Sequence, residues 1–536
     1  MEHTEAARET PIAPVRSPPN RSLWIALAVA TLGCLWPLWA VDMLPIVDLP
    51  QHLATVRILR DLHTPGWGMD AYYQLDLART QYLGWYALAV LLSHVMAIET
   101  AAKVLLSAYV FALPLAVFVY LRAHRRDPTW AIFAVPLALN DSLWMGFCNY
   151  VTAIPVLFLW LAATQAALDA PSRRRWVLLA FLPIAVYFLH AQALLHGVLL
   201  VFLTVLVHPN GLRTRIGLRT LAHVVPALLL FAGWALGSTI LASQSGWAAT
   251  RAGHNEPSSA LLYWPWPVRF SRLPDSLTDL YHDHMDQQIF AGLLLLAVGG
   301  VLYGVLDERG RSLPAPAIQR RFAAPEWAAL LTLVLYFAAP TRYKWIYAIN
   351  ARVVPILAVL LVAMCARVWV PRRGMLLIPG VVLAVALGLL HADRFALFNL
   401  EAKPARALLQ TLPQGQRGVG ILFNPTSVVT SNAPFLHFAQ YGVVDRGGMA
   451  DFSFANYPQS PVVFTPPGPP NLPVRFEKHP ERFTMRDHGW WYDWYLVRDY
   501  GPEVRMPLFL DGPDQVDGGE RRGLWQLFRR KTPRTQ

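Results

Sequence analysis

The sequence predicts a polytopic α-helical membrane protein with a small α/β domain at its C-terminal end. Hydrophobic residues make up 55% of the chain and charged residues only 15%. About eleven apolar runs between residues 22 and 391 are long enough, or nearly long enough, to cross a bilayer as helices. A single soluble core would not contain so many runs of this kind, so we expect a membrane-embedded region at 22–391 and a separate domain at 392–536.

The first apolar run, SLWIALAVATLGCLWPLWAV, follows a polar tail at 1–21 that we expect to be cytoplasmic and disordered. It lacks a small-residue cleavage site, so we interpret it as an uncleaved membrane anchor. The 3 cysteines lie in or beside apolar runs and indicate no disulfide framework. The predicted spans are 22–41, 101–121, 129–147, 150–168, 175–190, 192–208, 219–242, 289–306, 325–339, 353–370 and 374–391.

Basic residues between the spans predict the orientation. Cytoplasmic loops of membrane proteins carry an excess of Lys and Arg. If the N-terminal tail is cytoplasmic, these crossings put the basic loops on the same side, at 122–127, 172–176, 213–219, 307–321 and 371–373. A further apolar segment, 82–98, would reverse the pattern if it crossed, so we predict a juxtamembrane or re-entrant helix there. Orientation therefore explains the net charge of +12 without a nucleic-acid partner.

The same orientation makes residues 42–100 the first outer loop and places the C-terminal domain outside. A composition rich in Ala, Arg, Leu and Pro is typical of a bacterial chain, so we expect the bacterial inner membrane and a periplasmic domain. In that domain ILFNP, PVVFTP and YDWYLVRD indicate strands, and KPARALLQTL indicates a short helix. The Pro-rich stretch 457–473 indicates a loop or lid.

Asp48 is the first candidate for chemistry, because it lies just beyond the first span on the predicted outer side. A carboxylate at that depth loses hydration unless it is lifted into headgroup water or kept for chemistry. It could deprotonate an acceptor that arrives from outside. Alternatively, Asp48 only caps the next helix, with Pro50 in its first turn. Gln51 and His52 follow at helical spacing and could orient a ligand.

This arrangement resembles the GT-C glycosyltransferases, integral membrane enzymes that include protein mannosyltransferases, aminoarabinose transferases and oligosaccharyltransferases. The resemblance rests on the first span, the acidic residue that opens the first outer loop, the number of spans and the outer α/β domain. It implies sugar transfer from a polyprenyl-phosphate or polyprenyl-diphosphate carrier to a lipid, glycan or protein acceptor, with Asp48 as catalytic base or acceptor-positioning group. DLPQH stands where many relatives carry Asp-Glu, which leaves the role of a second carboxylate open.

A second polar patch, ALNDSLWMGFCNY, lies on the same predicted face and contains Asn140, Asp141 and Asn149. Relatives often carry acidic residues in the corresponding loop. Asp141 could therefore share in acceptor binding, or hold a divalent cation such as Mg²⁺ or Mn²⁺ together with Asp48, since hard cations prefer carboxylate oxygens. The alternative is an ordinary turn rich in Asn and Asp.

The segment TRYKWIYAINAR puts Arg342, Lys344 and Arg352 on the outer face, where basic residues are disfavoured. A lipid phosphate would explain them, because Arg offers a bidentate fork and Lys a point charge. The family resemblance agrees, since basic and aromatic residues such as Tyr343 hold the carrier phosphate ahead of a late span. Anionic membrane lipids or a salt bridge to the first loop are the alternatives. Arg269, in a separate outer loop, is a second possible phosphate ligand.

His190 lies at a predicted outer turn, where we expect it to line a pocket through hydrogen bonds. No Gly-rich loop of the kind that binds nucleotides stands out, which fits a lipid-linked donor better than a nucleotide sugar. Two other functions remain open: a non-catalytic assembly subunit for envelope polysaccharide, and a lipid or polysaccharide transporter. A transporter should carry ionisable residues deep within its spans, whereas the polar groups here gather near one face.

Overall fold

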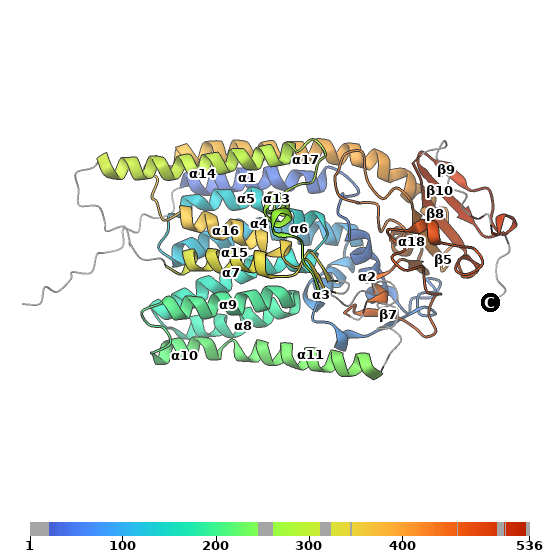
Figure 1. The fold of residues 1–536 in the computed structure, drawn as a ribbon, viewed down its shortest axis with the longest axis horizontal. Coiled ribbons are helices and arrows are strands. Elements are labelled where there is room, and N and C mark those ends of the chain that lie inside the picture. The colour runs from blue at the N-terminus through green and yellow to red at the C-terminus, as the bar shows by residue number, and fades with distance from the viewer. Residues whose placement is uncertain are drawn as a thin grey trace, which may run out of the picture.

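The computed structural model describes residues 21–244, 261–310, 323–343, 346–457, 459–500, 509 and 511–531. Residues 1–20 of the predicted tail and the candidate Lys344 lie outside the described residues. Most helices lie side by side along the long axis of the molecule, and the C-terminal sheet covers one end of the bundle (Figure 1).

Helices of very different length build the bundle. Six helical stretches among the described residues are long and apolar enough to cross a membrane, and shorter apolar helices accompany them. The helices are α1 (Arg21–Trp39), α2 (Leu49–Asp61), α3 (Leu83–Ser93), α4 (Ile98–Ala123), α5 (Ala134–Leu137), α6 (Asp141–Trp144), α7 (Cys148–Asp169), α8 (Arg173–Leu189), α9 (Ala191–Val207), α10 (Arg215–Ala222), α11 (Val225–Gln244), α13 (Trp266–Asp275), α14 (Met285–Gly310), α15 (Ala324–Ala338), α16 (Val354–Cys365), α17 (Gly374–Leu409) and α18 (Gln440–Arg446).

The predicted spans correspond to helices with one notable difference. The run 129–147 is not one helix but the 3-10 helix Pro128–Phe133 followed by α5 and α6. Pro136 lacks an N–H, and Asn140 starts a new helix by accepting a hydrogen bond from the N–H of Leu143, so a continuous ladder cannot form. The segment 82–98 forms α3, whose 11 residues extend only about 16 Å, half of a bilayer's hydrocarbon thickness. That length fits the predicted juxtamembrane helix.

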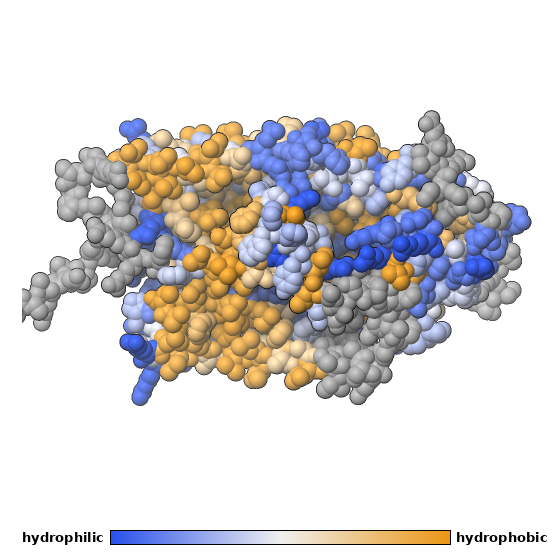
Figure 2. All heavy atoms as spheres, in the orientation of Figure 1, coloured by the Kyte–Doolittle hydropathy of each residue, from blue (hydrophilic) through white to orange (hydrophobic). Residues whose placement is uncertain are grey.

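The surface of the helical region is apolar. Figure 2 shows a hydrophobic band over these helices, polar groups at its far end, and a largely polar surface over the C-terminal domain. Large exposed side chains of the band include Leu32 on α1, Leu229 on α11, Leu295 on α14 and Ile378 on α17. Such a continuous apolar surface is stable in lipid and not in water, so the protein is a multi-pass membrane protein.

The C-terminal domain contains a five-stranded sheet in the order β6-β5-β8-β10-β9. Strand β5 runs parallel to its neighbours β6 and β8, and β10 runs antiparallel to β8 and β9. The domain is therefore α/β, as predicted. Its strands are β5 (Arg417–Leu422), β6 (Met449–Asp451), β8 (Trp494–Arg498), β9 (Glu520–Arg522) and β10 (Trp525–Arg529).

One helix joins the two parts of the molecule. The predicted short helix KPARALLQTL is the end of α17, which continues from the bundle into the domain without a break (Figure 1). The indole nitrogen of Trp525 on β10 donates to the carbonyl of Glu401 on α17 at 2.8 Å. The predicted boundary at 391/392 thus falls inside a helix that fixes the sheet against the bundle.

Short strands outside the main sheet connect the loops. In the first outer loop β1 (Tyr73–Leu75) pairs antiparallel with β7 (Val462–Phe464) of the Pro-rich stretch. A second small sheet joins β2 (Leu261–Leu262), β3 (Arg342–Tyr343) and β4 (Ile346–Tyr347) in that order. The first pairing ties the Pro-rich stretch to the loop that carries Asp48.

Close packing of α1 against α17 gives a first prediction. Small residues let these two helices approach closely. An added Cβ at Gly388 would therefore overlap the carbonyl oxygen of Gly33. We expect Gly388→Ala to cost about 1–3 kcal/mol and lower the Tm of the detergent-solubilised protein. The control is Gly299→Ala in α14, where nothing lies within 4 Å of the added atom. Equal Tm values for the two variants would contradict this account of the contact.

Candidate functional site

Asp48 stands at the start of α2 but does not cap it. Its side chain makes no capping hydrogen bond to the helix. The carboxylate instead faces the C-terminal domain, where Oδ1 lies 3.2 Å from Nε2 of His437. The side chain of Asp48 is 20% exposed, so the carboxylate is held through Oδ1 without being fully enclosed.

The main chain of Asp48 is fixed by the turn after α6. The N–H of Val47 donates to the carbonyl of Trp144 at 3.0 Å, and the N–H of Asp48 donates to the carbonyl of Met145 at 3.3 Å. Gly146 has a φ of +88°, and a Cβ there would lie 2.7 Å from the nitrogen of Asp48. Only glycine fits both the backbone conformation and the close approach. The segment that follows α1 and the turn that follows α6 therefore meet at Asp48.

His437 links Asp48 to a second carboxylate. Its Nδ1 lies 3.2 Å from Oε1 of Glu477, so the buried ring has a carboxylate at each nitrogen. Burial alone lowers the pKa of His437, but the carboxylates of Glu477 and Asp48 outweigh it and hold the pKa above the ordinary value of 6.5. The protonated ring is therefore the form that this site favours.

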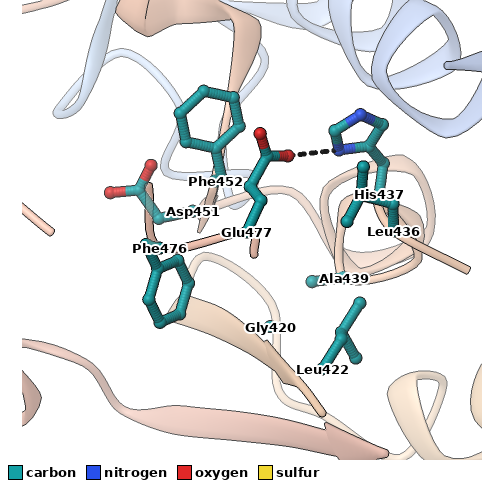
Figure 3. Close-up of a pocket in the computed structure, with 9 residues that line it drawn as sticks. All are labelled: Gly420, Leu422, Leu436, His437, Ala439, Asp451, Phe452, Phe476 and Glu477. Atoms are coloured by element: carbon teal, nitrogen blue, oxygen red, sulfur yellow. Dashed lines mark ion pairs between the residues drawn. The ribbon is translucent and has the colours of Figure 1, made fainter. Parts of the chain in front are cut away.

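A small cavity lies beside the pair His437–Glu477. Figure 3 shows the carboxylate of Glu477 facing the ring of His437, with Asp451 on the other side. The cavity offers about 10 Å³ to the centre of a water molecule, which is room for about one water. It cannot hold a sugar and instead separates the pair from the sheet. The lining residues are Gly420, Leu422, Leu436, His437, Ala439, Asp451, Phe452, Phe476 and Glu477.

Gln51 and His52 are both buried with their polar groups bonded to protein. The amide of Gln51 donates to the carbonyl of Phe452 at 2.8 Å and accepts from the N–H of Phe454 at 3.0 Å. His52 contacts the hydroxyl of Tyr86 at 2.7 Å and the carbonyl of Gly146 at 2.9 Å through its two ring nitrogens. We expected these side chains to orient a ligand. In the structure these side chains bond to the neighbours of α2, and a role toward a ligand stays a prediction.

Arg352 is the buried charge of the site. It lies in a 3-10 turn before α16, is 9% exposed, and stacks its guanidinium over Phe147 at 4.0 Å. The hydroxyl of Tyr150 donates to its main-chain carbonyl, which holds the turn in place. Within the described residues the guanidinium has no hydrogen bond and no ion pair, and its Nε is buried. A buried guanidinium without an anion is costly, so this position is suited to an anionic ligand.

Asp48 and Arg352 belong to the same electrostatic neighbourhood. The carboxylate of Asp48 interacts electrostatically with the guanidinium of Arg352, and so do the hydroxyls of Tyr82 and Tyr150. His190 lies against the rings of Tyr82 and Tyr150, with centroids 5.0 Å away in each case. His190 thus lines the same region, and its Nδ1 also accepts the N–H of Gln192 at the start of α9.

Asp141 lies in a different environment. The carboxylates that interact electrostatically with Asp141 are those of Asp279, Asp275 and Asp286, and that of Asp48 is not among them. Among the described residues no group of three or more His, Cys, Asp or Glu side chains could hold a metal ion. The predicted divalent cation between Asp48 and Asp141 therefore stays a prediction.

Two asparagines near Asp141 differ in their surroundings. Asn140 caps α6 and donates to the hydroxyl of Tyr109 at 2.9 Å, so its side chain is structural. Asn149 is buried in the first turn of α7, and its Oδ1 has no hydrogen-bond partner in the described chain.

The other basic candidates lie on other elements than Arg352. Arg269 is buried and donates to the carbonyls of Trp264, Phe337 and Ala339, so it clamps α13 to the end of α15. Arg342 and Tyr343 form β3, and Arg342 acts electrostatically on Tyr347. Arg342 thus lies in a small sheet, whereas Arg352 lies in the buried turn.

Sequence reasoning missed the residues that the C-terminal domain contributes. His437 lies in the apolar stretch FLHFA, and Glu477 in an irregular loop, so neither carries a recognisable motif. Phe147, Tyr82 and Tyr150 read as ordinary interfacial aromatics. Only the fold brings them to Asp48, and no spacing in the sequence would have shown it.

No protein-family model and no curated protein matches the sequence. Among solved structures, the chain is similar to ArnT from Cupriavidus metallidurans in the apo state, with 14% identity, a TM-score of 0.51, and coverage of 95% of this chain and 96% of ArnT. It is also similar to an Archaeoglobus fulgidus oligosaccharyltransferase, at 12% identity and a TM-score of 0.45 over 89% of this chain and 68% of that one. A mycobacterial arabinofuranosyltransferase, AftD, gives 13% identity and 0.44 over 96% and 40%. The fold shared with ArnT gives the protein GT-C-like architecture.

The raised pKa of His437 predicts a pH-dependent stability. Folding favours the protonated ring, so the contribution of His437 is fully present below about pH 6.5 and is lost as the pH rises through the higher folded pKa. We expect the Tm difference between wild type and His437→Gln to be largest near pH 6 and to shrink toward pH 9. Thermal unfolding across this range measures it. A difference that grows with pH would contradict the charged pairing.

Proposed function

We propose that the protein is a membrane glycosyltransferase that takes a sugar from a polyprenyl-phosphate carrier and transfers it to an acceptor at the outer face of a bacterial inner membrane. Asp48 acts on the acceptor hydroxyl, and Arg352 holds the carrier phosphate. The GT-C-like architecture supports this class of reaction. The single observation that carries the proposal is the buried, unpaired guanidinium of Arg352 in the electrostatic neighbourhood of Asp48.

A lipid-linked phosphate fits Arg352 better than a soluble anion does. The guanidinium lies at the start of α16, an apolar helix of the bundle, and Phe147 covers one face. A phosphate can accept the planar fork of Arg through two oxygens, which relieves the cost of the buried charge. A polyprenyl chain on that phosphate would remain among apolar helices and lipid. The ligand thus matches both the charge and its surroundings.

The chemistry divides between the two residues. As the sugar's anomeric carbon bonds to the acceptor oxygen, its bond to the phosphate oxygen breaks and the phosphate leaves with the electron pair. Oδ2 of Asp48 takes the acceptor proton, because Oδ1 is already engaged by His437. The guanidinium of Arg352 stabilises the negative charge that grows on the departing phosphate.

Asp48→Asn is expected to lower kcat at least about 100-fold, because the amide cannot accept the acceptor's proton. Binding of the carrier should change little, since Arg352 remains. Sugar transfer by purified protein in lipid nanodiscs, with a panel of polyprenyl-phosphate sugars, measures turnover, and the Tm confirms folding. If the folded variant transfers sugar as fast as the wild type does, the protein is not an enzyme of this kind and a scaffold role is favoured.

Arg352→Met is expected to weaken carrier binding about 10-fold to 100-fold, the usual loss for a hydrogen-bonded charge. Its Tm should stay unchanged or rise, because the variant removes a buried unpaired charge. Binding of a polyprenyl phosphate in nanodiscs measures the affinity. The matched control is Arg272→Met, which removes an exposed guanidinium paired with Asp275 and should leave affinity unchanged. Equal losses in both variants would indicate general attraction to anionic lipid instead.

A further inference from the structure

The C-terminal domain contacts the carboxylate of Asp48 through His437. We infer that His437 is a positioning residue that fixes the carboxylate of Asp48 for its reaction, and that Glu477 fixes the ring of His437 in turn. The inference rests on the proposed role of Asp48. It extends the catalytic apparatus from the membrane bundle to the C-terminal domain, so the site is complete only when the two parts are docked.

The contacts of His437 exceed what docking requires. The amide of Gln51 already binds the main chain on both sides of Ser453. Arg57 of α2 donates to the carbonyl of Val444 at 2.9 Å. These bonds hold α2 against the domain without any charge at His437. Docking therefore does not require His437, whose ring is 4% exposed between two carboxylates. We relate its position instead to the oxygen of Asp48 that it contacts.

The ring can hold Asp48 in one orientation. Nε2 lies 3.2 Å from Oδ1 of Asp48, so the ring holds one oxygen of the carboxylate. Nδ1 lies 3.2 Å from Oε1 of Glu477 and 3.2 Å from the amide nitrogen of Gln51, and these two neighbours fix the plane of the ring. The adjoining cavity has room for about one water, so the ring has little space to move. A carboxylate fixed in this way meets its substrate without a rotational search, and misplacement of a reacting group by about 1 Å can cost 100-fold in rate.

The charged and titratable groups around His437 come from several elements. Asp48 and His52 lie on α2, Glu477 lies in the loop that follows the Pro-rich stretch, and Asp451 on β6 lines the same cavity. Asp451 is engaged by the hydroxyl of Tyr492 at 3.0 Å, so it does not compete for the ring. The carboxylates that contact His437 are therefore those of Asp48 and Glu477, and the amide nitrogen of Gln51 lies against Nδ1 as well.

Turnover and carrier affinity of the full chain in nanodiscs test the inference. His437→Leu removes both contacts and is expected to lower kcat about 100-fold, while KM for the polyprenyl-phosphate sugar stays within about twofold. His437→Gln keeps an N–H donor toward Asp48 and should recover much of the lost kcat. Glu477→Gln, at a more exposed position, should lower kcat about fivefold and serves if His437→Leu does not fold. Arg57→Met, the control, breaks a docking contact away from Asp48 and should keep kcat within about twofold.

Two results would overturn the positioning role. One is a folded His437→Leu variant with the turnover of the wild type. The other is a loss of kcat in Arg57→Met as large as in His437→Leu, which would make docking the cause. A double-mutant cycle in Tm with Asp48→Asn and His437→Leu separates this inference from the proposed function, because leucine removes the contact with Asp48. Non-additive Tm changes with a wild type inactive on every carrier would sink the proposed function but keep the contact. Additive changes with an active wild type would sink the contact.

Discussion

The close approach of Asp48 to Gly146 decides where the candidate site lies. Between α1 and α2 the chain passes against the turn that follows α6. Only a glycine at 146 lets the two main chains come this close. This contact places the start of α2 at the domain-facing end of the bundle. The C-terminal sheet, carried on the continuous helix α17, then closes over α2 (Figure 1). The site is therefore a junction of three segments that are remote in sequence.

Two buried charges at this junction differ in whether the protein supplies an anion that contacts them. His437 has a carboxylate at each nitrogen, so its charge is stabilised within the protein. Arg352 has an aromatic face and a nearby carboxylate but no hydrogen-bonded anion among the described residues. Proteins seldom keep a buried guanidinium in that condition unless a ligand completes it. The contrast explains why the reaction's anionic leaving group is assigned to Arg352 and the fixing of Asp48 to His437.

Much of the fold could be predicted from the sequence, because the patterns that specify it are local. Apolar length located the helices, but α3 with 11 residues and α16 with 12 are nearly equal, so the juxtamembrane position of 82–98 stays a prediction. The broken segment 128–147 could not be foreseen from hydropathy, since its breaks come from Pro136 and the cap at Asn140. In the site, Asp48, His190 and Arg352 do lie in one region. Gln51, His52 and Arg269 turned out to be bonded to protein, and His437 was missed, because such partners are set by tertiary packing that no local pattern encodes.

A structure of the protein in lipid nanodiscs with a non-hydrolysable polyprenyl phosphonate sugar would test the central claim most directly. The account predicts that phosphonate oxygens lie within hydrogen-bond distance of the guanidinium of Arg352, about 2.7–3.2 Å, with the sugar between Arg352 and Asp48. A phosphonate bound instead at Arg342 or Arg272, with Arg352 still buried and unpaired, would contradict it.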